Sequence, residues 1–324
     1  MPHVVVAGPL HPSGRALLDG AEDVTVTYIP ETSEASLAAG IVDADAVLLR
    51  TQPMSAATVA KGRKLKIVSR HGVGYDAVDV DALTARGIAL AVCGDVNSTS
   101  VAEHAAMMIL ATCKRVLRAD ASVRSGPWEW RNKLEARDVR GRNLLLVGYG
   151  RIGRHTAAMM QAFGMNVRAH DPFLMEQGWP ETGVPSEESL HEGFAWADVI
   201  SFSLPHTGDP LVGRGEIARM RDGVVLINTA RGAIIDEPAL VEALQAGKVG
   251  AAGLDVFSAE PMPPDHPLNS FDQVLLTPHI GGLTQDAAER MAVSSAENIL
   301  DFFKGRLDPL LVVNREQIDG ELET

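Results

Sequence analysis

Cysteine is almost absent from this chain of 324 residues, which contains only Cys93 and Cys113. These two residues do not have the close spacing of a metal-ligand pair, so the sequence predicts no metal site. A protein with so few cysteines fits a reducing compartment, and we expect it to be cytoplasmic.

The chain also lacks a long hydrophobic run. Its most apolar stretch, Val101 to Cys113, contains Glu103 and His104 and is too short to span a bilayer. The N-terminus enters a predicted strand directly after His3, so we expect no signal peptide. These features predict a protein without a membrane partner.

Positive charge is in deficit as well. The 29 basic and 42 acidic residues give a net charge of −13, without a run of like charges that would indicate a tail. Because nucleic-acid binding requires clustered basic residues, this balance argues against a nucleic-acid partner. A hydrophobic content of 46% and a length of 324 residues fit about two globular domains.

Short strand-like runs alternate with amphipathic segments along the whole chain. This alternation predicts an α/β fold with mostly parallel sheets covered on both faces. The expected strands include 4–6, 24–28, 46–49, 66–69, 167–170, 199–203, 224–228, 251–255 and 274–277, with helices at 14–18, 56–61, 79–86 and 284–303. A capping box at Ser100 to Glu103 predicts a further helix that continues to about Leu117.

A glycine-rich turn follows the predicted strand Leu144 to Val147. Its pattern is G-x-G-x-x-G, with Gly148 for the tight turn, Gly150 for close approach to a pyrophosphate and Gly153 for helix packing. Backbone N–H groups at the start of the following helix favour a diphosphate. The turn therefore predicts dinucleotide binding, although a glycine turn without a chemical function can have the same sequence pattern.

Asp171 lies eighteen residues after Gly153, at the end of the next predicted strand. A carboxylate in this place accepts hydrogen bonds from the adenosine ribose and repels a 2′-phosphate. It is followed by Pro172 and not by a basic or hydroxyl residue. We therefore expect NAD as the cofactor in preference to NADP.

The turn comes unusually late, with a domain's length of chain before it. We expect a dinucleotide-binding domain over residues 99–287, inserted into a substrate domain formed by residues 1–98 and 288–324. The two chain crossings, near residues 100 and 285, would form the hinge.

Polar side chains follow the last three predicted strands of the inserted domain. Arg231, Asp255 and His279 come shortly after these strands, and Glu260 follows Asp255. Ligands of open α/β sheets bind beyond the carboxyl ends of the strands. The sequence therefore predicts that these four side chains gather where a nicotinamide would lie.

These residue types suit hydride transfer between NADH and a 2-oxo acid. His279 can give a proton to the carbonyl oxygen, Glu260 would favour the imidazolium form, and Arg231 offers a fork matched to a carboxylate. Asp255 could contact the nicotinamide amide or stabilise nearby loops. The alternatives remain open: a surface ion pair for Arg231, an ordinary turn at Glu260-Pro261 and a structural role for His279.

The chain resembles the D-isomer-specific 2-hydroxyacid dehydrogenases over roughly residues 45–315. The resemblance rests on an ordered series of motifs, which lie at Arg70–Asp76, Asn97–Glu103, Gly148–Gly153, Ser203–Thr207, Asn228–Gly232, Asp255–Pro261 and Thr277–Gly282. It implies a flavodoxin-like substrate domain, an inserted Rossmann NAD-binding domain and a homodimer with the helix from Val101 to Leu117 in the interface.

The resemblance also implies roles for individual residues. Arg231 binds the substrate, and Glu260 pairs with the catalytic His279. The backbone around Val73 and Gly74 holds the substrate carboxylate. The implied cofactor contacts are Gly148, Gly150, Arg151, Ile152, Gly153, Asp171, Leu204, Pro205, Thr229, Ala230, Asp255, His279 and Gly281.

The substrate is less well defined. Phosphoglycerate-type members share an Arg-x-Arg pair where this chain has Arg50-Thr51-Gln52, and a phosphate usually recruits more than one cation. Arg50 is thus a candidate substrate-binding residue, with Arg70 and Lys133 as possible compensating cations.

We therefore expect a small 2-oxo acid such as glyoxylate or hydroxypyruvate, with phosphoglycerate as the alternative. Formate dehydrogenases pair the histidine with glutamine, which disfavours that activity because this chain has Glu260. An NAD-sensing interaction protein, like the C-terminal binding protein corepressors, is the alternative of another class.

Overall fold

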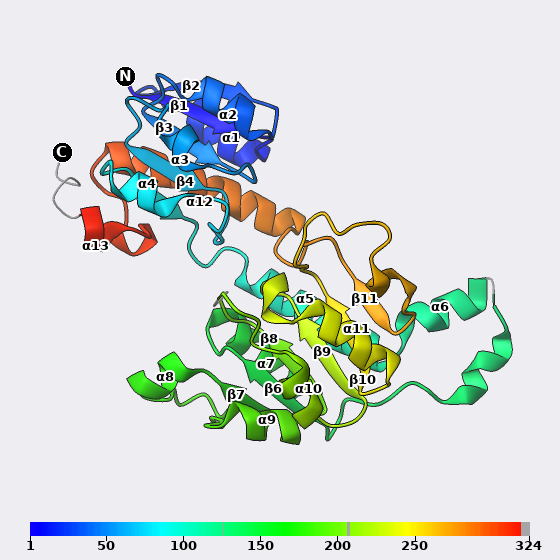
Figure 1. The fold of residues 1–324 in the computed structure, drawn as a ribbon. Coiled ribbons are helices and arrows are strands. Elements are labelled where there is room, and N and C mark those ends of the chain that lie inside the picture. Colours follow the sequence, from blue (N-terminus) through cyan, green and yellow to red (C-terminus); the bar gives the residue numbers. More distant parts are fainter. Residues whose placement is uncertain (125, 206–207, 319–324) are drawn as a thin grey trace. The chain divides into compact units, whose positions relative to one another are not determined.

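The computed structural model describes residues 1–124, 126–205 and 208–318 (Figure 1). The chain divides into two compact units, one made of Met1–Asn97 with Thr284–Thr324 and the other of Ser98–Leu283. The boundaries predicted from the sequence fall one and four residues later. No helix in the described part of the chain is both long enough and apolar enough to cross a membrane.

The first unit is built on a five-stranded parallel sheet in the order β2-β1-β3-β4-β5, which is the flavodoxin-like arrangement. Most of these strands are apolar because both faces of the sheet are buried, whereas the edge strand at residues 25–29 is partly exposed. The strands are β1 (His3–Ala7), β2 (Thr25–Ile29), β3 (Ala46–Leu49), β4 (Ile67–Arg70) and β5 (Ala89–Val92).

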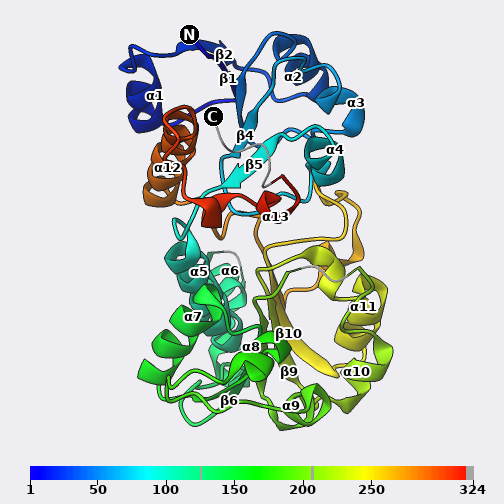
Figure 2. The same cartoon turned by 90° about the vertical axis from the view of Figure 1, so that its left-hand side faces the viewer.

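Helices cover both faces of this sheet (Figure 2). One face packs on α2 (Glu34–Gly40), α3 (Ala56–Val59) and α4 (Val80–Thr84). The other packs on α1 (Pro12–Asp19), α12 (Gln285–Phe303) and α13 (Arg315–Ile318), with the 3₁₀ turn η4 (Pro309–Leu311) between the last two. The Thr284 hydroxyl caps α12 by accepting a hydrogen bond from the Ala287 amide at 3.0 Å.

The second unit contains a six-stranded parallel sheet in the order β11-β10-β9-β8-β6-β7. A parallel bridge between Ala169 and Ser186 adds one more position outside β7, which gives the Rossmann order. The predicted α/β fold with two parallel sheets is thus confirmed. The strands are β6 (Asn143–Val147), β7 (Asn166–His170), β8 (Val199–Phe202), β9 (Val224–Asn228), β10 (Val249–Leu254) and β11 (Val274–Leu276).

Two helix layers enclose this second sheet (Figure 2). One layer contains α5 (Ser98–Cys113) and α7 (Arg151–Ala162), and the other contains α9 (Leu190–Trp196), α10 (Arg214–Arg219) and α11 (Glu237–Gln245). Shorter elements lie in the connections: α8 (Pro172–Gln177), η2 (Gly232–Ile234) and η3 (Pro267–Ser270).

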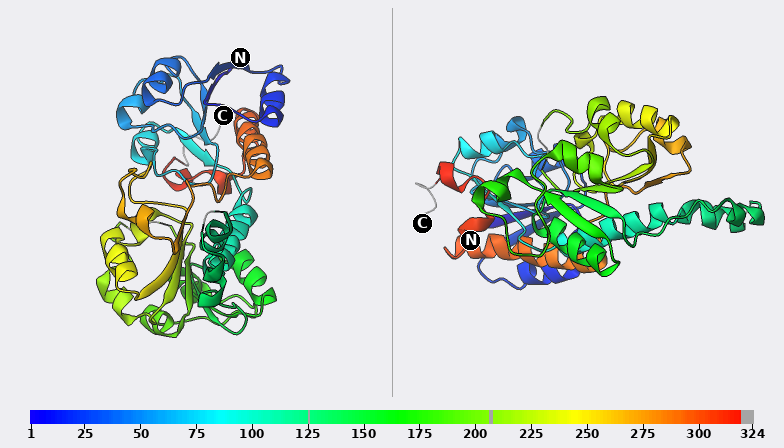
Figure 3. Two further views of the ribbon diagram at one scale, coloured as in Figure 1. Left: turned by 90° about the vertical axis from the view of Figure 1, so that its right-hand side faces the viewer. Right: turned by 90° about the horizontal axis from the view of Figure 1, so that it is seen from below.

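The helix predicted from Ser100 to Leu117 differs from the one observed. It begins at Ser98 and ends at Cys113, so Ser100 lies inside α5 and the predicted capping box is wrong. Arg115 has φ +56°, a left-handed conformation that breaks the helix. The chain continues as α6 (Val116–Arg124) and η1 (Trp128–Lys133), an arm that stands away from the sheet of its own unit (Figure 3).

Gly14 sets the packing of the first unit, because a Cβ atom there would lie 2.6 Å from the carbonyl oxygen of Ala292 in α12. We predict that Gly14→Ala lowers the free energy of unfolding by about 1–3 kcal/mol through overpacking. Gly215 is the matched control, since it also lies in the first turn of a helix but has open space around its Cβ position. Gly215→Ala should be neutral or stabilising by up to about 1 kcal/mol. Urea denaturation measures both, and equal effects would contradict the packing argument.

Candidate functional site

The carboxyl edge of the second unit's sheet carries the predicted site residues. Strands β9, β10 and β11 are neighbours in the sheet and end at Asn228, Leu254 and Leu276. The segments that follow them contain Arg231, Asp255 and His279 respectively. Because the strands are parallel, all three segments leave the sheet at the same edge.

His279 and Glu260 form a hydrogen-bonded pair. The Nδ1 atom of His279 lies 2.8 Å from Oε2 of Glu260, while Oε1 of Glu260 accepts a hydrogen bond from the Phe257 amide at 3.0 Å. The imidazole is 52% exposed, so its other nitrogen, Nε2, can face a ligand. The carboxylate thus fixes the orientation of the ring through Nδ1.

Asp255 organises the segment that carries His279. Its carboxylate is buried and accepts hydrogen bonds from the Thr277 hydroxyl at 2.5 Å, the Ile280 amide at 2.9 Å and the Gly281 amide at 2.8 Å. Its main-chain carbonyl accepts a further bond from the His279 amide at 2.8 Å. His279 has φ +53°, an unfavourable conformation for this residue, which the surrounding bonds hold in place.

His104 joins this network from helix α5. Its Nε2 atom lies 3.0 Å from the Thr277 hydroxyl and 3.5 Å from Oδ1 of Asp255. The sequence analysis noted this histidine only as a polar residue in an apolar stretch and assigned it no role in the site. That exception to the apolar pattern was the one available signal, and the fold is needed to show which residue the histidine meets.

The connection that carries Arg231 is fixed by hydrogen bonds from Asn228 and packs closely against the connection that carries Glu260. The buried Asn228 amide donates to the Arg231 carbonyl at 2.8 Å, and its oxygen accepts from the Ala230 amide at 3.1 Å. A Cβ atom on Gly232 would lie 1.9 Å from the Phe257 carbonyl carbon, so only glycine allows this approach. The Arg231 guanidinium is partly buried and donates to the Ala230 carbonyl at 2.7 Å.

The glycine-rich turn has the close contacts that its three glycines allow. A Cβ atom on Gly148, which has φ +94°, would lie 2.3 Å from the Ser203 carbonyl oxygen, and one on Gly153 would lie 2.4 Å from the Gly148 carbonyl oxygen. A Cβ atom on Gly150 would meet nothing within 4 Å. Gly150 therefore leaves room for a ligand at the start of α7, whose first residues are Arg151 and Ile152.

Asp171 lies beside this turn and already has two backbone partners. One carboxylate oxygen accepts from the Tyr149 amide at 2.8 Å, and the other accepts from the Leu174 amide at 3.1 Å as the cap of α8. A carboxylate has room for about four hydrogen bonds, so two remain for the hydroxyl groups of a ribose. The position fits a dinucleotide bound over the turn.

Unpartnered polar atoms mark the same edge of the sheet. The hydroxyl oxygens of Ser203 and Thr229, at the ends of β8 and β9, are buried without a hydrogen-bond partner among the described residues. Buried hydroxyls normally have one, so a ligand fits here. Leu204, Pro205 and Ala230 line the same two connections. His206 and Thr207, which belong to one family motif, lie outside the described residues.

The predicted substrate-side residues Arg50, Val73 and Gly74 belong to the first unit, where they follow β3 and β4. The Arg50 guanidinium donates to the Pro9 carbonyl at 2.8 Å, and its Nε atom is buried without a partner in the described chain. Burial, together with the charges of Arg50 and Arg70, lowers the pKa of His71 to about 4, so His71 is neutral at pH 7.

Comparison with known proteins places this arrangement in one family. Residues 106–281 match the family model described as D-isomer specific 2-hydroxyacid dehydrogenase, NAD binding domain. The chain is 39% identical over 264 residues to D-3-phosphoglycerate dehydrogenase of Archaeoglobus fulgidus, which covers 81% of this chain and 50% of that enzyme. It is 36% identical to glyoxylate reductase of Thermofilum pendens, which covers 97% of this chain and 95% of the reductase.

A solved structure is similar over the full length. The glyoxylate reductase from Paecilomyes thermophila has a TM-score of 0.87 and 30% identity, covering 97% of this chain and 99% of that one. By contrast, the chain spans only about half the length of the D-3-phosphoglycerate dehydrogenase from Archaeoglobus fulgidus.

The contacts of Asp255 generate a prediction. In Asp255→Asn, the amide nitrogen would replace an oxygen that accepts a hydrogen bond, leaving at least one buried donor unpaired. We expect the free energy of unfolding to fall by about 1–3 kcal/mol and the Ile280 and Gly281 amides to lose protection from hydrogen exchange.

Asp222→Asn is the control, because that carboxylate is 90% exposed and pairs with Lys248 at the surface. Its effect should stay within about 0.5 kcal/mol. Unchanged exchange at Ile280 and Gly281 in Asp255→Asn would show that the carboxylate does not hold this segment.

Proposed function

This chain belongs to the D-isomer specific 2-hydroxyacid dehydrogenase family, and we propose that it interconverts a 2-oxo acid and a D-2-hydroxy acid with NAD. The single observation that carries the proposal is the His279–Glu260 hydrogen bond of 2.8 Å at the carboxyl edge of the NAD-binding sheet. The glycine-rich turn leaves the same edge of this sheet, at the end of β6. The same geometry is what a proton donor for a carbonyl needs.

The four residues of the site have different roles in this reaction. His279 gives its Nε2 proton to the carbonyl oxygen during reduction and takes it back during oxidation. Glu260 holds the imidazole through Nδ1, so that Nε2 is free to face the carbonyl oxygen. Arg231 binds the substrate carboxylate with its planar fork and polarises the carbonyl. Asp255 keeps the His279 segment in place and could also meet the nicotinamide amide.

NAD supplies or accepts the hydride in such a reaction. The turn at Gly148, Gly150 and Gly153 would hold the diphosphate, with Arg151 and Ile152 opening the helix behind it. Asp171 would bind the adenosine ribose and disfavour a 2′-phosphate. The Thr229 hydroxyl, Leu204, Pro205, Ala230 and Gly281 would complete the cofactor contacts.

For the substrate we propose a small 2-oxo acid such as glyoxylate or hydroxypyruvate. The match to a glyoxylate reductase, which covers nearly the whole length of both chains, supports this choice. The single arginine in the segment Arg50–Gln52 supports it as well. We further propose that residues 1–98 and 288–324 form the substrate domain, with the backbone of Val73 and Gly74 binding the carboxylate.

One observation favours phosphohydroxypyruvate, the oxo acid of phosphoglycerate, as a second candidate. Burial lowers the pKa of the Arg50 guanidinium, and this side chain has no carboxylate partner among the described residues. A partly buried, uncompensated arginine is suited to an anionic substrate group such as a phosphate.

A screen of 2-oxo acids tests the proposed activity directly. We expect NADH oxidation with glyoxylate or hydroxypyruvate, and weaker activity with NADPH. Phosphohydroxypyruvate, pyruvate and phenylpyruvate complete the panel. His279→Ala should lower kcat/KM by about 100- to 10,000-fold, as expected for loss of a general acid, while NADH affinity stays nearly constant.

His191→Ala is the matched control, since this exposed histidine lies in α9 and not at the carboxyl edge. Full activity of His279→Ala would remove His279 from the mechanism. Tight NADH binding without turnover of any oxo acid would instead favour an NAD-sensing interaction protein.

We also propose that the protein is a cytoplasmic homodimer. Its two cysteines are buried free thiols, which fits a reducing compartment. The arm formed by α6 and η1 buries none of its own residues against the unit and exposes large apolar side chains. These are Val116, Leu117, Val123 and Trp128, with Leu134 directly after η1. A second copy of the chain would cover them.

The double variant Val123→Glu and Leu134→Glu tests this interface. We expect the parent protein to sediment as a dimer and the variant as a monomer, because burying two carboxylates is unfavourable. Phe173→Glu is the control, since Phe173 is 68% exposed on α8 outside the arm. A monomeric parent, or a variant that remains dimeric, would contradict the proposal.

A further inference from the structure

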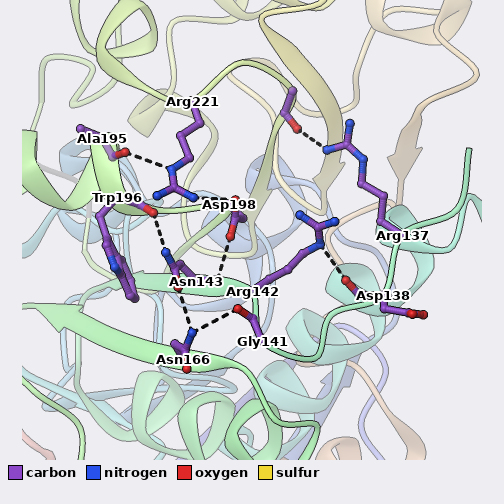
Figure 4. A network of polar contacts seen from close by, with 11 residues as sticks. Arg137, Asp138, Gly141, Arg142, Asn143, Asn166, Ala195, Trp196, Asp198 and Arg221 are labelled. Atoms are coloured by element: carbon purple, nitrogen blue, oxygen red, sulfur yellow. Dashed lines mark hydrogen bonds and ion pairs between the residues drawn. The ribbon is translucent and has the colours of Figure 1, made fainter.

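A small cavity of about 120 Å³ lies at the amino edge of the second unit's sheet, at the opposite strand ends from His279. It is formed where the segments before β6, β8 and β9 meet the end of α5. Arg137 and Arg142 line it from the connection before β6, and Arg221 lines it from the connection before β9, together with Asp198 (Figure 4). Cys113, at the end of α5, lines it as well. The proposed dehydrogenase reaction uses none of these residues.

Two of the three arginines have no carboxylate partner among the residues that the structure describes. Arg137 donates from Nη1 to the Gly223 carbonyl at 3.1 Å, and Arg142 donates from Nε to the Asp138 carbonyl at 2.7 Å (Figure 4). Both partners are neutral carbonyl groups. A guanidinium has five N–H donors, so each arginine keeps several for another acceptor.

The acidic side chains around the cavity already pair with other cations. Asp198 accepts from Arg221 at 2.9 Å and, through its second oxygen, from the Asn143 amide at 2.9 Å. Asp222 pairs with Lys248 at 2.8 Å, and Asp138 pairs with Lys114 at 2.5 Å. In the described part of the chain, none of these carboxylates therefore forms an ion pair with Arg137 or Arg142.

Cys113, in the wall of the cavity, lies close to several cations. Burial raises the pKa of its thiol, and the charges that oppose this rise come from Arg142, Arg137, Arg115 and Lys114, in that order. All four are cations, which agrees with the pairing of the acids elsewhere. The cavity is thus positively charged and partly enclosed.

We propose that this cavity binds a compact oxyanion with the chemistry of a phosphate group. Arginine forks match phosphate oxygens in pairs, and charge-assisted hydrogen bonds of this kind are stronger than neutral ones. The volume exceeds that needed for several waters, so one tetrahedral anion can enter. The site takes either inorganic phosphate or the phosphate of a small monoester.

An anion in this cavity would contact the amino edge of the NAD-binding sheet, where the end of α5 meets the segments before β6, β8 and β9. The anion would bridge Arg137, in the connection that leads from the arm, to Arg142 at the start of β6, beside the start of β9. A ligand that binds only the folded state stabilises it by mass action. We therefore infer a stabilising or regulatory anion site separate from the reaction edge.

Thermal unfolding of the full chain tests the site. Saturating NADH is present throughout, so that the glycine-rich turn is already filled. Millimolar inorganic phosphate should raise the unfolding midpoint by roughly 2–4 °C above sodium chloride at the same ionic strength. Arg142→Gln should weaken the apparent phosphate affinity by about ten- to a hundredfold, since it removes charged hydrogen bonds.

Arg140→Gln is the matched control. Arg140 lies in the same turn and loses the same charge, but it does not line the cavity. Arg137→Gln should behave like Arg142→Gln. The proposal would be overturned if phosphate raised the unfolding midpoint equally in the parent and in both cavity variants. It would also be overturned if sodium chloride at the same ionic strength raised the midpoint as much as phosphate does. A variant whose midpoint is lower in chloride but still rises fully with phosphate would overturn it too.

Two further titrations separate the sources of the anion. Sulfate should compete with phosphate, because it has the same shape. Glycerol phosphate that binds as tightly as inorganic phosphate would indicate a monoester ligand, whereas binding of inorganic phosphate alone would indicate the free ion.

Discussion

The buried carboxylate of Asp255 is the interaction on which the candidate site depends. It gathers the Thr277 hydroxyl and two successive backbone amides, and its own carbonyl holds the His279 amide. A left-handed residue on a loop has little intrinsic reason to stay in one conformation. These bonds supply that reason, and they fix the imidazole before any ligand arrives. A site organised in this way loses little conformational freedom on binding.

Local sequence patterns were enough to predict most of the architecture. Strands such as β3 and β9 are continuous apolar runs, because both faces of a parallel sheet are buried, and they were predicted with their observed bounds. The rule that ligands lie beyond the carboxyl ends of strands then directed attention to Arg231, Asp255, Glu260 and His279. Both steps use only short-range spacing along the chain.

The features that were missed depend on contacts between distant segments. The end of α5 was placed about four residues late because nothing near Arg115 in the sequence forbids a helix; the break is visible only where its guanidinium reaches the Gly250 carbonyl at 2.9 Å. His104 could not be assigned because its partners follow it by more than 150 residues. Likewise, Asp171 was expected to meet a ribose, and its capping of α8 was not foreseen.

The glycine at position 232 has a consequence for how such a site can change. The Phe257 backbone occupies the space that a side chain at position 232 would need. The connection that carries Arg231 and the connection that carries Glu260 are therefore packed closely against each other. Neither loop can be lengthened, swapped or redesigned alone without displacing the other. Under the proposal that the first unit forms the substrate domain, new substrate preferences should be sought in that unit, while these two connections stay unchanged.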